Sequence, residues 1–270
     1  MPDIVIHALV SAAYLGLAWH FWNTRWRRRE APQRPGLAPW ERAAILLPLA
    51  VHGWLLYDGI FSRELRFGFA QALSVMMFLG VALYWIEGLF ANLEGLEPLI
   101  LPLAAVAAPL PALFAGRSIP ASSAEFKLHL ALAMVAYGLF TIALLHAALM
   151  ALVERHLHRK SANFAARLPP LLTLERSLFR TIGVAFVFLT LTLATGMVLT
   201  DALFGRLMRL NHETVFAVLS WLIFGWLLAG RWRYGWRGRT ALRWTIAGFV
   251  MVLLANVGTA FVLEVILKRA

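Results

Sequence analysis

The sequence has 270 residues, of which 61% are hydrophobic and only 14% are charged, and its mean hydropathy is +0.72. These values exclude an ordinary soluble domain, in which about a quarter of the residues are charged. The 25 Lys and Arg outnumber the 14 Asp and Glu, which in a soluble protein would suggest a nucleic-acid partner. In a membrane protein, basic residues instead collect in the loops on one side. We therefore expect a lipid bilayer as the main partner and no nucleic acid.

Several classes of chemistry find no support in the sequence. It contains no cysteine, which excludes disulfides, thiolate catalysis and cysteine-ligated metals or iron-sulfur clusters. The motifs G-x-x-x-x-G-K-S/T, G-x-S-x-G and H-E-x-x-H are also missing, so phosphate-cradling loops, serine nucleophiles and zinc hydrolysis are not indicated. The protein is not expected to be a self-contained enzyme.

Long apolar runs recur along the chain, each long enough to cross about 30 Å of hydrocarbon as a helix. They predict a single integral membrane domain over residues 1–270, with spans at 4–22, 40–60, 69–90, 98–115, 128–152, 181–203, 215–230 and 244–267. The fourth span contains Pro102, Pro109 and Pro111, which free backbone carbonyls and indicate a kinked or re-entrant segment. The expected fold class is an all-α polytopic membrane bundle of about eight transmembrane helices.

The distribution of basic residues predicts the orientation of the bundle. The connections 22–42, 154–180 and 231–243 hold 17 of the 25 Lys and Arg, and the connections on the opposite side hold the other 8. The more basic side is expected to be cytoplasmic, so both termini lie outside in a cytoplasmic-type inner membrane. If the fourth span does not cross, the later spans invert.

The connection 154–180 is the longest between spans. It is basic and contains Pro169 and Pro170, followed by Leu171, Leu172 and several further apolar residues. This pattern predicts a short helix that lies in the membrane interface before the sixth span begins.

Histidine is a common ligand for metals and haem, and inside a membrane it needs a partner. The predicted topology divides the eight histidines evenly. Four fall at or beyond the inner helix ends, where an interfacial or solvated role is expected: His20, His146, His156 and His158. The other four lie on the outer half: His7, His52, His129 and His212.

His52 and His129 are the candidate ligand pair. His52 lies inside the second span, about 9 Å deeper than Asp58 at about 1.5 Å per residue, and is expected to be the most buried histidine. His129 opens the fifth span, and Ala133 and Ala136 follow on its face, which allows close approach of either a flat ligand or another helix. Two imidazoles from different helices can supply both axial ligands of a haem iron. The alternative is that both histidines only pack between helices.

Four sequence segments resemble the cytochrome c assembly protein family, which includes CcsA and HemX. The first is the segment Gly235-Trp-Arg-Gly-Arg239, which precedes Trp244-Thr-Ile-Ala-Gly-Phe. The second is the histidine-led segment His129-Leu-Ala-Leu-Ala-Met-Val-Ala-Tyr137-Gly. The segments Pro169-Pro-Leu-Leu-Thr-Leu-Glu175-Arg176 and Leu191-Thr-Leu-Ala-Thr-Gly196 are most similar to the YpjD branch of inner-membrane proteins.

The resemblance implies an eight-span bundle that handles haem. His52 and His129 match histidines of that branch, which makes them the implied cofactor-binding residues and axial iron ligands. Four residues belong to the family signature without an assigned role: Trp236, Arg237, Gly238 and Arg239. The motif W-G-x-x-W-x-W-D of the CcsA synthetase branch is missing, and Asn211-His212-Glu213 precedes the seventh span instead. Cytochrome c synthase activity is therefore not expected.

Three functions follow from these observations. The first is a haem-binding or haem-passing accessory protein that works with a haem-pathway partner. The second is a cofactor-free regulatory or scaffold subunit that docks a cytoplasmic protein on the inner surface formed by 154–180 and 231–243. The third is a small-solute or ion transporter, which the shortage of carboxylates near the membrane midplane disfavours.

Overall fold

The computed structural model describes residues 2–27, 37–61, 65–90, 95–118, 123–158, 168–204 and 211–267. Its first part contains α1 (Pro2–Phe21), the π-helical turn η1 (Trp22–Arg27), α2 (Pro39–Phe61), β1 (Arg66–Phe67), α3 (Phe69–Phe90), α4 (Glu97–Ala107), α5 (Leu110–Leu113) and β2 (Arg117–Ser118). Its second part contains α6 (Ala124–His158), α8 (Leu171–Phe204), α9 (His212–Tyr234), α10 (Gly238–Leu253), η2 (Leu254–Gly258), α11 (Thr259–Phe261) and η3 (Val262–Ile266).

The described residues include seven helices that are long and apolar enough to cross a membrane. They cover Ile4–Arg27, Pro39–Ile60, Phe69–Phe90, Ala124–His156, Leu171–Leu199, His212–Tyr234 and Gly238–Ile266. Each corresponds to one of the spans predicted from hydropathy. The fold class, an all-α polytopic membrane bundle, is confirmed.

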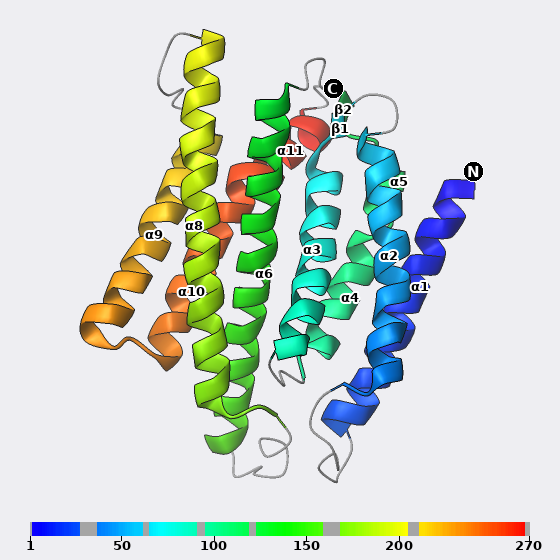
Figure 1. Cartoon of the computed structure of the whole chain (residues 1–270), viewed down its shortest axis with the longest axis vertical. Helices are drawn as coiled ribbons and strands as arrows, with labels where there is room; N and C mark the ends of the chain where they lie inside the picture. Colours follow the sequence, from blue (N-terminus) through cyan, green and yellow to red (C-terminus); the bar gives the residue numbers. More distant parts are fainter. Residues whose placement is uncertain are drawn as a thin grey trace.

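The predicted fourth span is shorter and broken. It forms α4, of 11 residues, and α5, of 4 residues, which meet at Pro109. A proline has no backbone N–H to continue the helix. Even so, the segment returns to the end of the bundle from which α3 started, because β2 pairs antiparallel with β1, with Arg66 opposite Ser118. The later helices therefore keep their expected alternation, and both termini lie at the same end of the bundle (Figure 1).

The prediction of a separate interfacial helix before the sixth span is wrong. The structure has one continuous helix, α8, from Leu171 to Phe204. The backbone N–H groups of Thr173 and Leu174 bond to the carbonyl of Pro170, so the proline pair starts the helix instead of separating two. Leu174, Leu178, Ile182 and Ala185 are all fully buried, and this single apolar stripe runs past the basic residues without a break.

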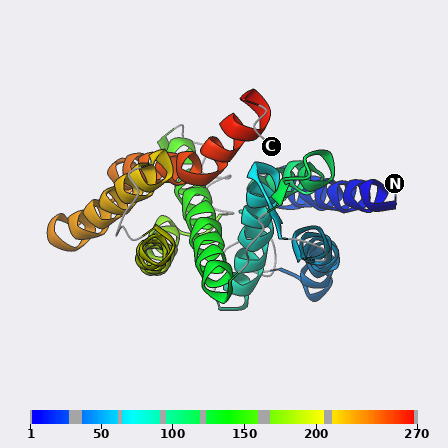
Figure 2. The ribbon, with the colours of Figure 1, turned by 90° about the horizontal axis from the view of Figure 1, so that it is seen from above.

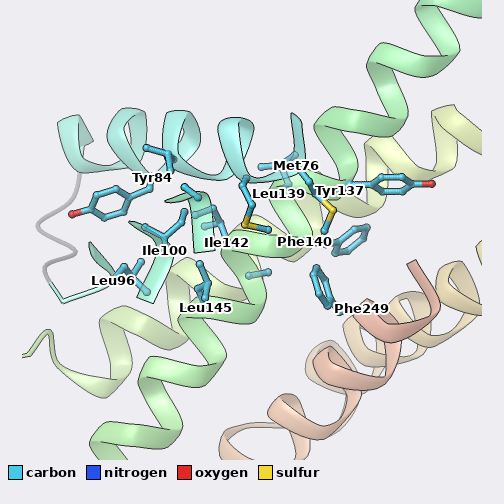
Figure 3. Close-up of a cluster of buried hydrophobic side chains, with 14 of the residues drawn as sticks. Met76, Tyr84, Leu96, Ile100, Tyr137, Leu139, Phe140, Ile142, Leu145 and Phe249 are labelled. Atoms are coloured by element: carbon cyan, nitrogen blue, oxygen red, sulfur yellow. The ribbon is translucent and has the colours of Figure 1, made fainter. Parts of the chain in front are cut away.

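The bundle has two halves that meet along α3 and α6. In the first half α2 and α4 pack against α3, and α1 packs against α4 and α2. In the second half α8 and α10 pack against α6, and α9 packs against α10 (Figure 2). Gly138 allows α3 and α6 to approach closely, since a Cβ there would lie 2.7 Å from the Cβ of Leu79. Figure 3 shows the shared core, in which Met76 from α3 lies near Phe140 from α6, while Tyr84 from α3 lies on the side of Ile100 from α4.

Part of the charge pattern lies outside the described residues. The basic residues within 28–34, 159–167, 206–209 and 268–269, and the one at 63, lie outside the described residues. The assignment of the basic end to the cytoplasm therefore stays a prediction. In Figure 1 it is the lower end, where α6 ends and α8 begins.

Candidate functional site

His52 is fully buried on α2 and lies between α1 and α3. Its Nε2 is 2.9 Å from the hydroxyl of Ser74, and its Nδ1 is 3.4 Å from the hydroxyl of Tyr14. The rings of Tyr14 and Phe78 approach it edge-on, with centroids 5.8 and 5.7 Å away. The burial of His52 agrees with the deep position predicted for it from the sequence. Both ring nitrogens already have hydroxyl partners, so a metal could bind only if one of them were displaced.

His129 is partly buried near the start of α6 and faces α8. Its Nδ1 is 3.0 Å from Oγ1 of Thr195. The Thr195 hydroxyl donates its one proton to the backbone carbonyls of Leu191 and Thr192, so it accepts from His129 and fixes the ring proton on Nδ1. The lone pair then belongs to Nε2. A hydrogen bond of this kind orients many histidine metal ligands.

Gly196 gives the ring of His129 the space it needs. A Cβ at position 196 would lie 3.2 Å from Cε1 of His129, which is tighter than an ordinary van der Waals contact. The segment Leu191–Gly196, noted for its family resemblance, thus supplies both the hydroxyl that orients the ring and the small residue beside it. The structure brings two of the resembling segments together around one histidine.

The structure does not bring His52 and His129 together. Helix α2 packs against α3, and α3 packs against α6, so α3 stands between the two histidines (Figure 2). Two imidazoles on one iron need their nitrogens about 4 Å apart, twice a metal-imidazole bond of about 2 Å. In this arrangement they do not fit a single haem as an axial pair. His129 fits the chemistry of a ligand by its tautomer, and His52 fits a packed core position.

The remaining histidines have varied surroundings. His7 donates from Nδ1 to the carbonyl of Ala108 at 2.7 Å, and His20 lies 3.0 Å from Glu41. The solvated or interfacial role predicted for His146 is wrong. α6 continues to His158, which places His146 about 18 Å before the helix end at about 1.5 Å per residue, and its side chain is fully buried.

The family signature forms a tight turn between α9 and α10. Gly235 ends α9 with a positive φ of 65°, and Gly238 begins α10 with a φ of 52°, conformations that favour glycine. The ring of Trp236 lies on Gly230, where any Cβ would overlap it, and it is parallel to Trp244 with the ring planes 3° apart. The glycines and the tryptophan therefore define the turn.

The arginines of the turn bind acidic residues on the two longest helices. Glu175 at the start of α8 is 2.6 Å from Arg231 and 3.3 Å from Arg237, while Glu154 near the end of α6 is 3.3 Å from Arg239. Glu175 is the acidic residue of the Pro169–Arg176 segment. The Arg237–Glu175 ion pair thus joins two of the resembling segments, which gives the signature a structural role.

Comparison with known proteins agrees with these segments. A family model described as cytochrome C assembly protein matches residues 40–267. The inner membrane protein YpjD of Escherichia coli K12 is 33% identical over 138 residues, which cover 51% of this chain and 52% of YpjD. An uncharacterized 28.8 kDa protein of Azospirillum brasilense is 33% identical over 182 residues, covering 64% of this chain and 66% of that protein.

More distant relatives include the cytochrome c biogenesis protein CcsA of Heterosigma akashiwo. It is 33% identical over 91 residues, covering 34% of this chain and 28% of CcsA. The chain thus spans about half the length of YpjD and less of CcsA. No solved structure matches it. The described residues contain seven long apolar helices, and the chain is a multi-pass membrane protein of the inner membrane.

Proposed function

Because the chain belongs to the cytochrome c assembly protein family, we propose that it takes part in cytochrome c biogenesis as a haem-handling membrane protein. The observation that carries the proposal is the orientation of His129. Thr195 holds the ring proton on Nδ1 and leaves the lone pair on Nε2, the state in which imidazole binds iron. Bound haem would supply an iron with two axial positions open to protein ligands.

In this proposal His129 is the first ligand and His52 has a separate role. Because the ring of His52 is bonded to Ser74, His52 could bind iron only in a state in which α1 or α3 has moved. His52 would then serve a second haem in the first half of the bundle. Haem bound at His129 would draw its other axial ligand from elsewhere, including a partner protein of the haem pathway.

We further propose an accessory role, not a synthase. The family segments around His129 and the signature turn are present, whereas the tryptophan-rich motif of the CcsA synthetase branch is missing from the sequence. A protein of this kind would hold or pass haem, and attachment to the apocytochrome would fall to another protein.

The test is the absorption spectrum of the gently solubilised protein from cells with an enhanced haem pathway. We expect the unmodified protein to show a Soret band. In the His129→Ala variant this band should be at least about tenfold weaker, which corresponds to about 1.4 kcal/mol of binding free energy. The His156→Ala variant is the matched control, because His156 lies near the opposite end of the same helix, where its Nδ1 bonds to the carbonyl of Leu152. His52→Ala reports whether that residue binds a second haem.

Two results would contradict this proposal. One is a preparation without haem, and the other is a His129→Ala spectrum equal to that of the unmodified protein.

A second candidate is a cofactor-free scaffold subunit, which the complete bonding of His52 and the ion-paired inner end favour. Its surface would be the end of the bundle around Glu154, Glu175 and the signature turn, where it would dock a cytoplasmic protein. A cofactor-free preparation, together with a partner cross-linked at Tyr234 or Arg233, would support this candidate over haem handling.

A further inference from the structure

A histidine and a glutamate that the proposed function does not use meet at the seam between the two halves of the bundle. His146 from α6 is fully buried, and its Nε2 is 3.4 Å from Oε2 of Glu87 on α3. The backbone carbonyl of Ile142, one turn earlier on α6, acts on the ring of His146, whereas among the described residues Oε2 of Glu87 forms no hydrogen bond. Buried polar atoms are rarely left in this state, so the pair needs an explanation.

The two side chains differ in their exposure at the protein surface. The side chain of His146 is 0% exposed, and that of Glu87 is 10% exposed. Ser177 from α8 hydrogen-bonds the Glu87 carboxyl, and the Arg180 guanidinium on the same helix acts on it electrostatically. The carboxyl is therefore the outward member of the pair, and the ring is the inward member.

The separation of 3.4 Å is slightly longer than an ordinary N–H···O bond of about 2.7 to 3.2 Å. A small shift of either side chain closes it. With one proton between them, the pair is either a neutral carboxylic acid beside a neutral ring or a carboxylate beside an imidazolium. Both states leave the site with the same total charge, so moving the proton within the pair adds no net charge to the protein interior.

From this geometry we propose that Glu87 and His146 form a buried proton-binding site. The carboxylate takes up one proton from water at the predicted cytoplasmic end. The Glu87 O–H bond then breaks as the Nε2–H bond of His146 forms, and no electron is transferred. Because α3 and α6 join the two halves, the position of this proton alters the contact between them.

The neighbouring helices bring other charges to this region. The guanidinium of Arg42 on α2 donates to the carbonyl of Gly88 at 3.3 Å, next to Glu87. Glu97 on α4 accepts from Tyr84 and from the backbone of Gly95. Elements α5 and η2 contain no charged residue. Toward the same end of the bundle, the adjoining helices also carry Glu41 on α2, Glu154 and Arg155 on α6, Glu175 and Arg176 on α8, and Arg239 and Arg243 on α10.

The experiment is pH-difference infrared spectroscopy of the full chain in lipid nanodiscs, following the carboxylic acid C=O band. We expect a band that is lost in Glu87→Gln and kept in the control Glu154→Gln. In His146→Gln the midpoint of this band should move by at least about one pH unit, because the ring no longer shares the proton. His156→Gln is the control for a histidine on the same helix and should leave the midpoint unchanged.

Two outcomes would overturn the proposal. One is a parent spectrum without a band that depends on Glu87, and the other is an unchanged midpoint in His146→Gln. If Glu87→Gln does not fold, Ser177→Ala removes the hydroxyl that bonds the carboxyl but keeps both members of the pair. That variant must shift the midpoint as well, and failure to shift it counts against the site. The readout contains no haem, so its result is independent of the proposed haem function.

Discussion

Gly235 and Gly16 have equally open surroundings but different backbone conformations, and the comparison shows why the signature turn requires glycine at position 235. Gly235 has a φ of 65°, whereas Gly16 lies within helix α1, and a Cβ at either position would meet no atom within 4 Å. Space is therefore equal at the two sites. The left-handed backbone is the difference, and it penalises any residue with a Cβ.

Substitution of these two glycines separates strain from packing. Gly235→Ala should destabilise the protein by about 1 kcal/mol, the cost of a left-handed conformation. Gly16→Ala should be neutral or stabilise it by up to about 1 kcal/mol, because alanine restricts the unfolded chain. Thermal unfolding in detergent measures both. Equal effects of the two substitutions would show that the turn does not hold position 235 in the left-handed region.

The sequence identified residue types better than it identified their partners. The deep burial of His52 followed from its place in an apolar run. The burial of His146 was not predicted. The fifth span predicted from hydropathy ended at residue 152, which placed His146 near a helix end, whereas α6 continues to His158. Its neighbour Glu87 belongs to another helix, and no local pattern in a single sequence indicates a contact between α3 and α6.

At the scale of elements, helix ends are where hydropathy was least informative. Arg176 and Arg180 lie just before the predicted sixth span, 181–203, and belong to the basic connection for which a separate helix was predicted. They are four residues apart and exposed, while Leu174 and Leu178, also four apart, are buried. The period of four was visible in the sequence and indicates one amphipathic helix. The pairing of Glu175 with arginines of the turn was not visible, since it depends on how three helices meet.

The ion pairs of the turn should differ in strength according to burial. Glu175→Gln should destabilise the protein by about 1.5 to 3 kcal/mol, because the buried Glu175 holds the half-buried Arg231 at 2.6 Å. Glu154→Gln is the matched control, and its pair with the exposed Arg239 should be worth about 0.5 kcal/mol or less. Unfolding by denaturant in mixed micelles compares the two. A loss for Glu154→Gln as large as that for Glu175→Gln would contradict the ranking.

At the scale of the whole molecule, the pairing of β1 with β2 decides the topology. It joins the start of α3 to the end of α5, so the broken fourth segment must return across the bundle. The prolines predicted the break but not the return, because a re-entrant loop and a crossing segment have the same local sequence.

The absence of cysteine makes this topology directly testable. Ser118→Cys lies at the end of the bundle with both termini, and Tyr234→Cys lies at the basic end (Figure 1). A membrane-impermeant maleimide should label Ser118→Cys in intact cells and Tyr234→Cys only after permeabilisation. Three membrane-spanning helices, α6, α8 and α9, separate the two positions, so labelling of both from one side would mean that one of these three does not cross. The reverse pattern would mean either that the fourth segment does not cross or that the orientation predicted from charge is wrong.

The contacts of α4 with α1 bear on the order in which the protein assembles. His7 donates to the carbonyl of Ala108 and Ser11 donates to that of Ala105, both at 2.7 Å. These bonds and the β1–β2 pairing connect elements within the first half of the bundle and involve no residue of the second half. Their donors and acceptors are synthesised before α6 leaves the ribosome, so this half can form in the bilayer while translation continues. We therefore expect helix α6 to insert later, against a surface of α3 that is already in place.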